Sequence, residues 1–269
     1  MKRSLNVFFL FFTQAIKIEL VYRSQILQRL LGLFVMISVT VFFWLTVSRK
    51  AEMQGYTPDK ILLYFISACF HDFIFISGDE LTKKIGESIR SGKLSSGLIQ
   101  PFPYLVRLFA NGLGGIVLRW LISVPIALLI VRGLVGTNDF SILSLQAFFY
   151  AVAFIFAVTI CLICLIAAAM LAFDMTEVWA VWVIFVSMYC MFSGYFYPAD
   201  LATGVIASLM HWLPFYYMLG FPCLIVAGRL GTGEILWGLA HAVFVLSYMT
   251  LLLGFLWKRG IKKFEAVGL

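Results

Sequence analysis

Long apolar runs recur from one end of the chain to the other, and they constrain its fold more than any other feature. Six such runs, parted by short polar stretches, cover about residues 30–47, 61–77, 104–131, 143–173, 178–196 and 235–257. Each is close to the ~20 apolar residues that a helix needs to cross a bilayer. With 62% hydrophobic and 12% charged residues, this chain of 269 residues has more apolar surface than one soluble core can bury. We therefore predict an all-α, polytopic membrane protein with six transmembrane helices.

The segment before the first run has a different character. In residues 1–28 apolar side chains recur at helical spacing among polar ones, which predicts a helix lying in the membrane interface. The other connections are too short for a soluble domain. We therefore expect residues 1–269 to form a single transmembrane domain.

Residues 198–233, ahead of the last run, are apolar but interrupted by prolines and glycines. This pattern predicts two short helices that form a re-entrant or interfacial hairpin, because neither is long enough to span. Asp200 is the expected N-cap of the first helix.

The distribution of lysine and arginine predicts the orientation. With both termini in the cytoplasm, fourteen of these residues lie inside and five outside, in agreement with the positive-inside rule. The formal charge of +7 then indicates contact with anionic membrane lipids, and no nucleic acid partner is expected. The predicted location is the cytoplasmic membrane, with multiple passes.

The longest polar stretch contains a short amphipathic helix at residues 79–92. Its apolar side chains follow one face at steps of four, with charged side chains around them: Leu81, Ile85 and Ile89, then Lys83, Lys84, Glu87 and Arg90. Such a helix either rests on lipid headgroups or docks in a groove of a cytoplasmic partner and transmits its motion. The residues alone do not decide between the two.

No pattern indicates catalysis, a cofactor or a metal site. The three histidines lie in separate segments without ligands at metal-binding spacing. Residues 86–94 imitate a phosphate-binding loop, but they contain one residue too many and end in Leu94 where Ser or Thr would bind magnesium. We therefore assign no catalytic, cofactor-binding or metal-binding residue.

Polar residues inside the apolar runs are costly and are candidates for function. The ionisable candidates are His71, Asp72 and Arg119. Asp72 and Arg119 fall at similar depth on consecutive antiparallel helices, so we hypothesise that they form an ion pair. The alternative is that Arg119 faces a water-filled pathway without a partner.

Three blocks resemble a known family. They are residues 88–94 with the sequence SIRSGKL continuing to LIQP at 98–101, residues 192–201 with FSGYFYPADL, and residues 213–217 with LPFYY followed by Phe221-Pro222 and Gly228-Arg229. In this order and spacing they resemble the ABC-2 type permeases, in particular the bacterial six-span permeases encoded in pairs beside one ATPase.

The resemblance implies a permease subunit of an ATP-driven exporter. A second permease, related or identical, would complete the pathway, and a dimer of separate ATPase subunits would couple to residues 79–92. The chain itself would not be an enzyme. The hairpin would form an extracellular gate that includes Tyr195, Pro198, Asp200, Pro214 and Phe215. The alternatives are an ion-coupled carrier or channel, or an intramembrane lipid-modifying enzyme.

Overall fold

The computed structural model describes residues 2–50, 55–75, 78–135, 145–175 and 178–264. Throughout these ranges the regular structure is helical, as predicted. The α-helices are α1 (Lys2–Val21), α2 (Arg23–Lys50), α3 (Pro58–Phe75), α4 (Gly78–Arg90), α5 (Leu94–Leu98), α6 (Tyr104–Val135), α7 (Leu145–Met170), α8 (Val178–Phe192), α9 (Gly204–Trp212), α10 (Pro214–Met218), α11 (Gly220–Val226) and α12 (Thr232–Lys263). Two short 3-10 turns cover Leu171–Phe173 and Ala199–Leu201.

Among the described residues, four helical segments are long and apolar enough to cross a membrane: Ser24–Val47, Tyr104–Leu134, Leu145–Phe173 and Thr232–Lys263. The chain is therefore a multi-pass membrane protein. The other two predicted crossings correspond to α3 and α8. Helix α3 has 18 residues, including Asp59, Lys60 and Asp72, and α8 has 15 residues. A passage of these two helices through the membrane stays a prediction.

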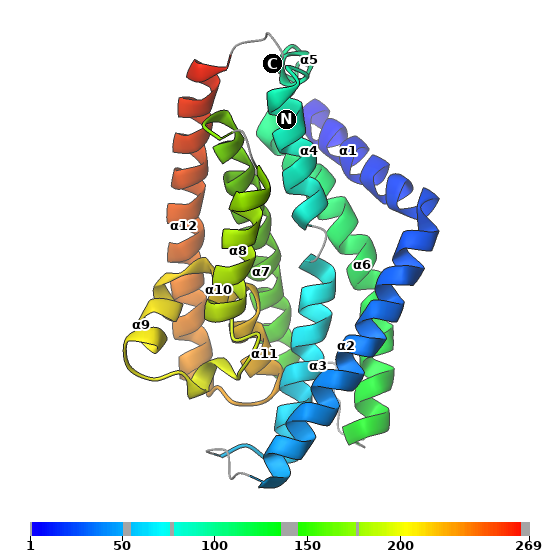
Figure 1. Cartoon of the computed structure of the whole chain (residues 1–269), viewed down its shortest axis with the longest axis vertical. Helices are drawn as coiled ribbons and strands as arrows, with labels where there is room; N and C mark the ends of the chain where they lie inside the picture. The colour runs from blue at the N-terminus through cyan, green and yellow to red at the C-terminus, as the bar shows by residue number, and fades with distance from the viewer. Residues whose placement is uncertain (1, 51–54, 76–77, 136–144, 176–177, 265–269) are drawn as a thin grey trace.

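Helix α7 forms the centre of the bundle (Figure 1). It packs against α4, α10, α11 and α12, and most of its side chains are buried. Its sequence explains this position, because it is apolar on every side and rich in alanine. A helix that is apolar all round is stable only when other helices or lipid cover it.

The interfacial helix predicted for residues 1–28 ends earlier than expected. Helix α1 stops at Val21, and α2 begins at Arg23. Helix α1 packs along α6, where Gly114 permits close approach: a Cβ there would lie 2.5 Å from the carbonyl oxygen of Phe12. The start of α1, the end of α12 and α5 lie at the same end of the bundle (Figure 1).

The predicted hairpin contains three short helices instead of two. Helices α9, α10 and α11 have nine, five and seven residues, each too short to cross about 30 Å. Helix α9 is largely exposed, whereas every residue of α10 is buried. The expectation that Asp200 caps the first helix is wrong, because Thr203 occupies the N-cap of α9 and Asp200 binds other groups.

Candidate functional site

Helix α4 turns its apolar face into the protein. Ile85 and Ile89 are 2% and 6% exposed and belong to the main core, and Leu81 packs against that core. The receiving surface is formed by α7, α8 and the turn at Leu171–Phe173. Of the predicted coupling residues, Ile85 and Ile89 are therefore covered by the chain's own helices, whereas Leu81 is partly exposed and lines a cavity.

The charged side of α4 remains accessible. Lys83, Lys84, Glu87 and Arg90 are exposed, and all four were predicted as coupling residues. The helix ends before Gly92, whose φ of +71° is the left-handed conformation that glycine adopts at helix ends. The charged residues therefore project from a helix whose opposite face is held firmly by the core.

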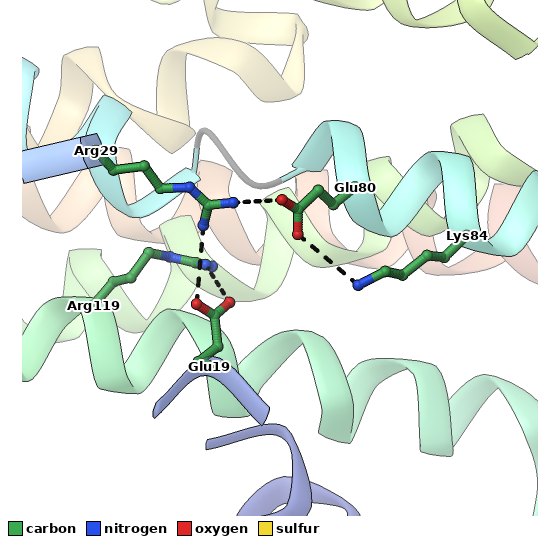
Figure 2. A network of polar contacts seen from close by, with 5 residues as sticks. All are labelled: Glu19, Arg29, Glu80, Lys84 and Arg119. Atoms are coloured by element: carbon green, nitrogen blue, oxygen red, sulfur yellow. Dashed lines mark hydrogen bonds and ion pairs between the residues drawn. The ribbon is translucent and has the colours of Figure 1, made fainter. Parts of the chain in front are cut away.

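An ionic network joins α4 to three other helices (Figure 2). Arg119 Nη1 on α6 lies 2.9 Å from Glu19 Oε1 on α1. Arg29 on α2 lies 3.9 Å from the same carboxylate and donates a hydrogen bond to Glu80 on α4. Lys84 approaches Glu80 at 3.9 Å. One chain of charges thus links α1, α2, α4 and α6.

The partner of Arg119 differs from the predicted one. Arg119 is 4% exposed, and its guanidinium pairs with Glu19 and not with Asp72. The alternative of a partnerless arginine facing water is also wrong. Gly115 provides the room, because a Cβ there would lie 3.1 Å from Glu19 Oε1. Sequence analysis missed Glu19 because residues 1–28 were expected to form a helix in the membrane interface.

A cavity of about 450 Å³ lies beside this network, between α1, α4, α6 and α7. Its charged lining consists of Glu19, Glu80, Lys84, Arg107 and Arg119. At its edge, the Arg107 guanidinium lies over the rings of Phe11 and Tyr104 and donates to Gln100. Side chains that border a void lack contacts on one side, so small displacements of α1 and α4 disturb less packing here than elsewhere in the core.

A second polar cluster lies at the opposite end of the bundle. Asp200 accepts hydrogen bonds from Tyr56 at 2.5 Å and from Arg229 Nε at 2.9 Å. Arg229 also donates to the carbonyl of Gly55 at 2.8 Å, and its guanidinium lies 4.1 Å from the centre of the Tyr56 ring. Burial and the hydrogen bond to Asp200 raise the pKa of Tyr56, which keeps the phenol protonated as a donor. The cluster ties the loop before α3 to both ends of the hairpin.

The predicted gate residues do not form one exposed surface. Pro198, Pro214 and Phe215 are buried, while Tyr195 is partly exposed. The turn beside them is fixed by Tyr64, a residue that sequence analysis missed. Its hydroxyl donates to the carbonyl of Gly194 at 2.8 Å and accepts from the backbone of Ala199 at 3.2 Å.

Gly194 adopts a φ of +85°, and a Cβ there would lie 2.4 Å from the Tyr64 hydroxyl. Glycine is therefore required at this turn for both its conformation and its size.

His71 is a core residue. Its Nδ1 lies 2.9 Å from the carbonyl oxygen of Ser67, and its ring contacts Tyr150 and Phe154 edge to face. Across the described part of the chain, no group of three or more His, Cys, Asp or Glu side chains is placed to hold a metal ion.

Comparison with known proteins adds one finding. The sequence model of a family described as "ABC-2 family transporter protein" matches residues 34–268, most of the chain. No individual curated protein matches it.

Proposed function

The chain belongs to the ABC-2 family of transporter proteins, and on that premise we propose that it is a membrane subunit of an ATP-driven exporter. It forms half of the translocation pathway. A second permease chain supplies the other half, and a dimer of separate ATPase subunits binds on the cytoplasmic side. ATP hydrolysis takes place on those partners.

The observation that carries this proposal is the arrangement of α4. One face of the helix is fixed in the core, and its charged face and tip are exposed. The ionic network connects α4 to α1, α2 and α6 (Figure 2). A push on the exposed end of α4 therefore reaches α2 directly, through Glu80 and Arg29, and it reaches α1 and α6 through the carboxylate of Glu19. This is the mechanical property that a subunit driven from outside needs.

The proposal is tested by co-purification. The full chain, solubilised in mild detergent from its native cells, is expected to bring down an ABC ATPase and a second permease copy. Repeated recovery of the chain without any ATPase would remove the basis for the proposal.

The tip of α4 is the predicted contact with the ATPase. Arg90→Glu reverses an exposed charge in the last turn of α4 without touching the core. We expect a loss of at least about tenfold in transport, with unchanged amounts of permease in the membrane, because like charges across an interface oppose association. Transport and ATPase rates in reconstituted vesicles measure the effect.

Lys258→Glu is the matched control, since it makes the same charge change at an exposed site on α12. Equal activity of Arg90→Glu and Lys258→Glu would contradict the role of the α4 tip.

The orientation follows from the same proposal: α5 and the ends of the chain face the cytoplasm, and α9 lies outside. A cysteine at Thr203 or Ser208, both exposed, is expected to react with an impermeant thiol reagent added to intact cells. The native cysteines are replaced beforehand. A cysteine at the exposed Ser96 of α5 serves as the control and is expected to react only after permeabilisation. The reverse labelling pattern would invert the topology.

A further inference from the structure

Asp72 is a carboxylate without a counter-charge in the part of the chain that the structure describes. It lies in the last turn of α3 and is partly exposed. The described residues provide no hydrogen bond or ion pair to it, and Arg119, the arginine expected to pair with it, is held by Glu19. An apolar segment rarely carries an ionisable group unless that group serves a function.

The surroundings of Asp72 supply a second, independent sign of a binding site. Tyr189 on α8 has a buried hydroxyl that finds no hydrogen-bond partner among the described residues. Cys69 and Phe73, the residues of α3 one turn before and directly after Asp72, belong to a buried cluster against which Met36 of α2 packs. The two tyrosine rings lie 6.2 Å apart, and Tyr195 OH reaches Met36 Sδ on α2 at 3.8 Å. The Asp72 carboxylate, the Tyr189 hydroxyl and the rings of Tyr189 and Tyr195 therefore lie in one region between α2, α3 and α8.

The helices around this group expose large apolar side chains. Val39 and Phe42 of α2 are 64% and 75% exposed, and Met191 of α8 is 52% exposed. Helices α2, α3 and α8 lie toward the viewer in Figure 1, in front of α6 and α7. A group that binds there meets an apolar, aromatic surface with one negative charge. That combination suits a lipophilic cation, which is stabilised by the carboxylate and by aromatic rings.

We propose that Asp72 binds the positively charged centre of the transported substrate, and that the substrate class is the amphiphilic cation. This inference rests on the proposed function, since it places the α2–α3–α8 face along the pathway between two permease subunits. Asp72 supplies the counter-charge, and Tyr189 and Tyr195 provide aromatic and hydroxyl contacts to the bound cation.

Two ions of matched shape and opposite charge test the proposal. The full chain in lipid nanodiscs is titrated with tetraphenylphosphonium and, separately, with tetraphenylborate. The wild-type chain is expected to bind the cation more tightly than the anion. Asp72→Asn is expected to weaken cation binding at least about tenfold and to leave anion binding unchanged or stronger. Asp59→Asn, at an exposed position in the first turn of the same helix, is the control and is expected to bind like the wild type.

The melting temperature of Asp72→Asn distinguishes a binding role from a structural one. Neutralising a carboxylate without a partner is expected to leave the melting temperature unchanged or to raise it. A clear drop would mean that Asp72 forms a structural pair, for instance with a basic side chain of the second subunit, and would overturn the proposal. Equal cation affinity in wild type and Asp72→Asn would overturn it as well. Neither result depends on the ATPase, so co-purification tests the exporter assignment separately.

Discussion

Replacing Ile85 with aspartate is expected to prevent the protein from accumulating in its folded form. Ile85 is 2% exposed and packs in the main core beneath α4. The change removes a buried aliphatic side chain, which alone destabilises by about 2–5 kcal/mol when truncated to alanine. It also places a carboxylate in an apolar environment without a partner, which adds several kcal/mol. The amount and homogeneity of the solubilised protein in size-exclusion chromatography measure the outcome.

The neighbouring Lys84→Asp is the control, because the Lys84 side chain is 73% exposed and its ion pair with Glu80 is long at 3.9 Å. Exposed pairs of this kind contribute about 1 kcal/mol or less. We expect Lys84→Asp to fold normally. A folded, abundant Ile85→Asp protein would show that the apolar face of α4 is not part of this chain's core.

Helix α4 illustrates what a hydrophobic period can and cannot predict. The spacing of Leu81, Ile85 and Ile89 correctly predicted a helix with one face to bury. It could not identify the surface that buries this face, because a partner, a lipid layer and the chain's own helices all satisfy the same pattern. The structure assigns the face to α7 and α8, which leaves the charged residues as the candidates for coupling.

The predicted membrane spans also show what a sequence pattern can and cannot predict. Four of the predicted crossings correspond to helices that are long and apolar enough by themselves. The composition of α3 does not by itself indicate a membrane span, because this helix carries three charged residues. Most of its side chains are nevertheless buried against α2, α6 and α11. A helix covered by other helices can carry polar groups that a lipid-facing helix cannot. Composition alone does not distinguish the two situations.

The pairing of Arg119 depended on a contact between segments a hundred residues apart. The similar depth of Asp72 and Arg119 on consecutive helices made Asp72 the expected partner. Glu19 was not predicted as a partner, because residues 1–28 were expected to lie in the membrane interface. The signal that was missed is the cluster of small residues at Gly112, Gly114 and Gly115 of α6. A Cβ at Gly114 would collide with Phe12 of α1, and one at Gly112 with Leu162 of α7, so these glycines mark positions at which other helices pack closely against α6.

Glu19→Gln is expected to lower the free energy of unfolding by about 3 kcal/mol, the lower end of the range for breaking a buried ion pair. The change leaves the buried Arg119 without its carboxylate, and it removes the negative charge that both Arg119 and Arg29 contact (Figure 2). Glu87→Gln, at an exposed position on α4, is the control and is expected to change stability by less than about 0.5 kcal/mol. Reversible unfolding in mixed micelles measures both.

Removing Glu19 and removing Arg119 are expected to destabilise the protein to different extents, because the two side chains differ in burial and in their remaining partners. Arg119→Gln is expected to destabilise less than Glu19→Gln, because the Glu19 side chain is 21% exposed and keeps Arg29 at 3.9 Å. The double variant Glu19→Gln/Arg119→Gln should be more stable than Glu19→Gln alone, since it no longer buries an arginine beside a neutral amide. If the double variant were instead as unstable as the sum of the two single changes, the two residues would act independently. In that case the ionic network could not be what ties α1 to α6.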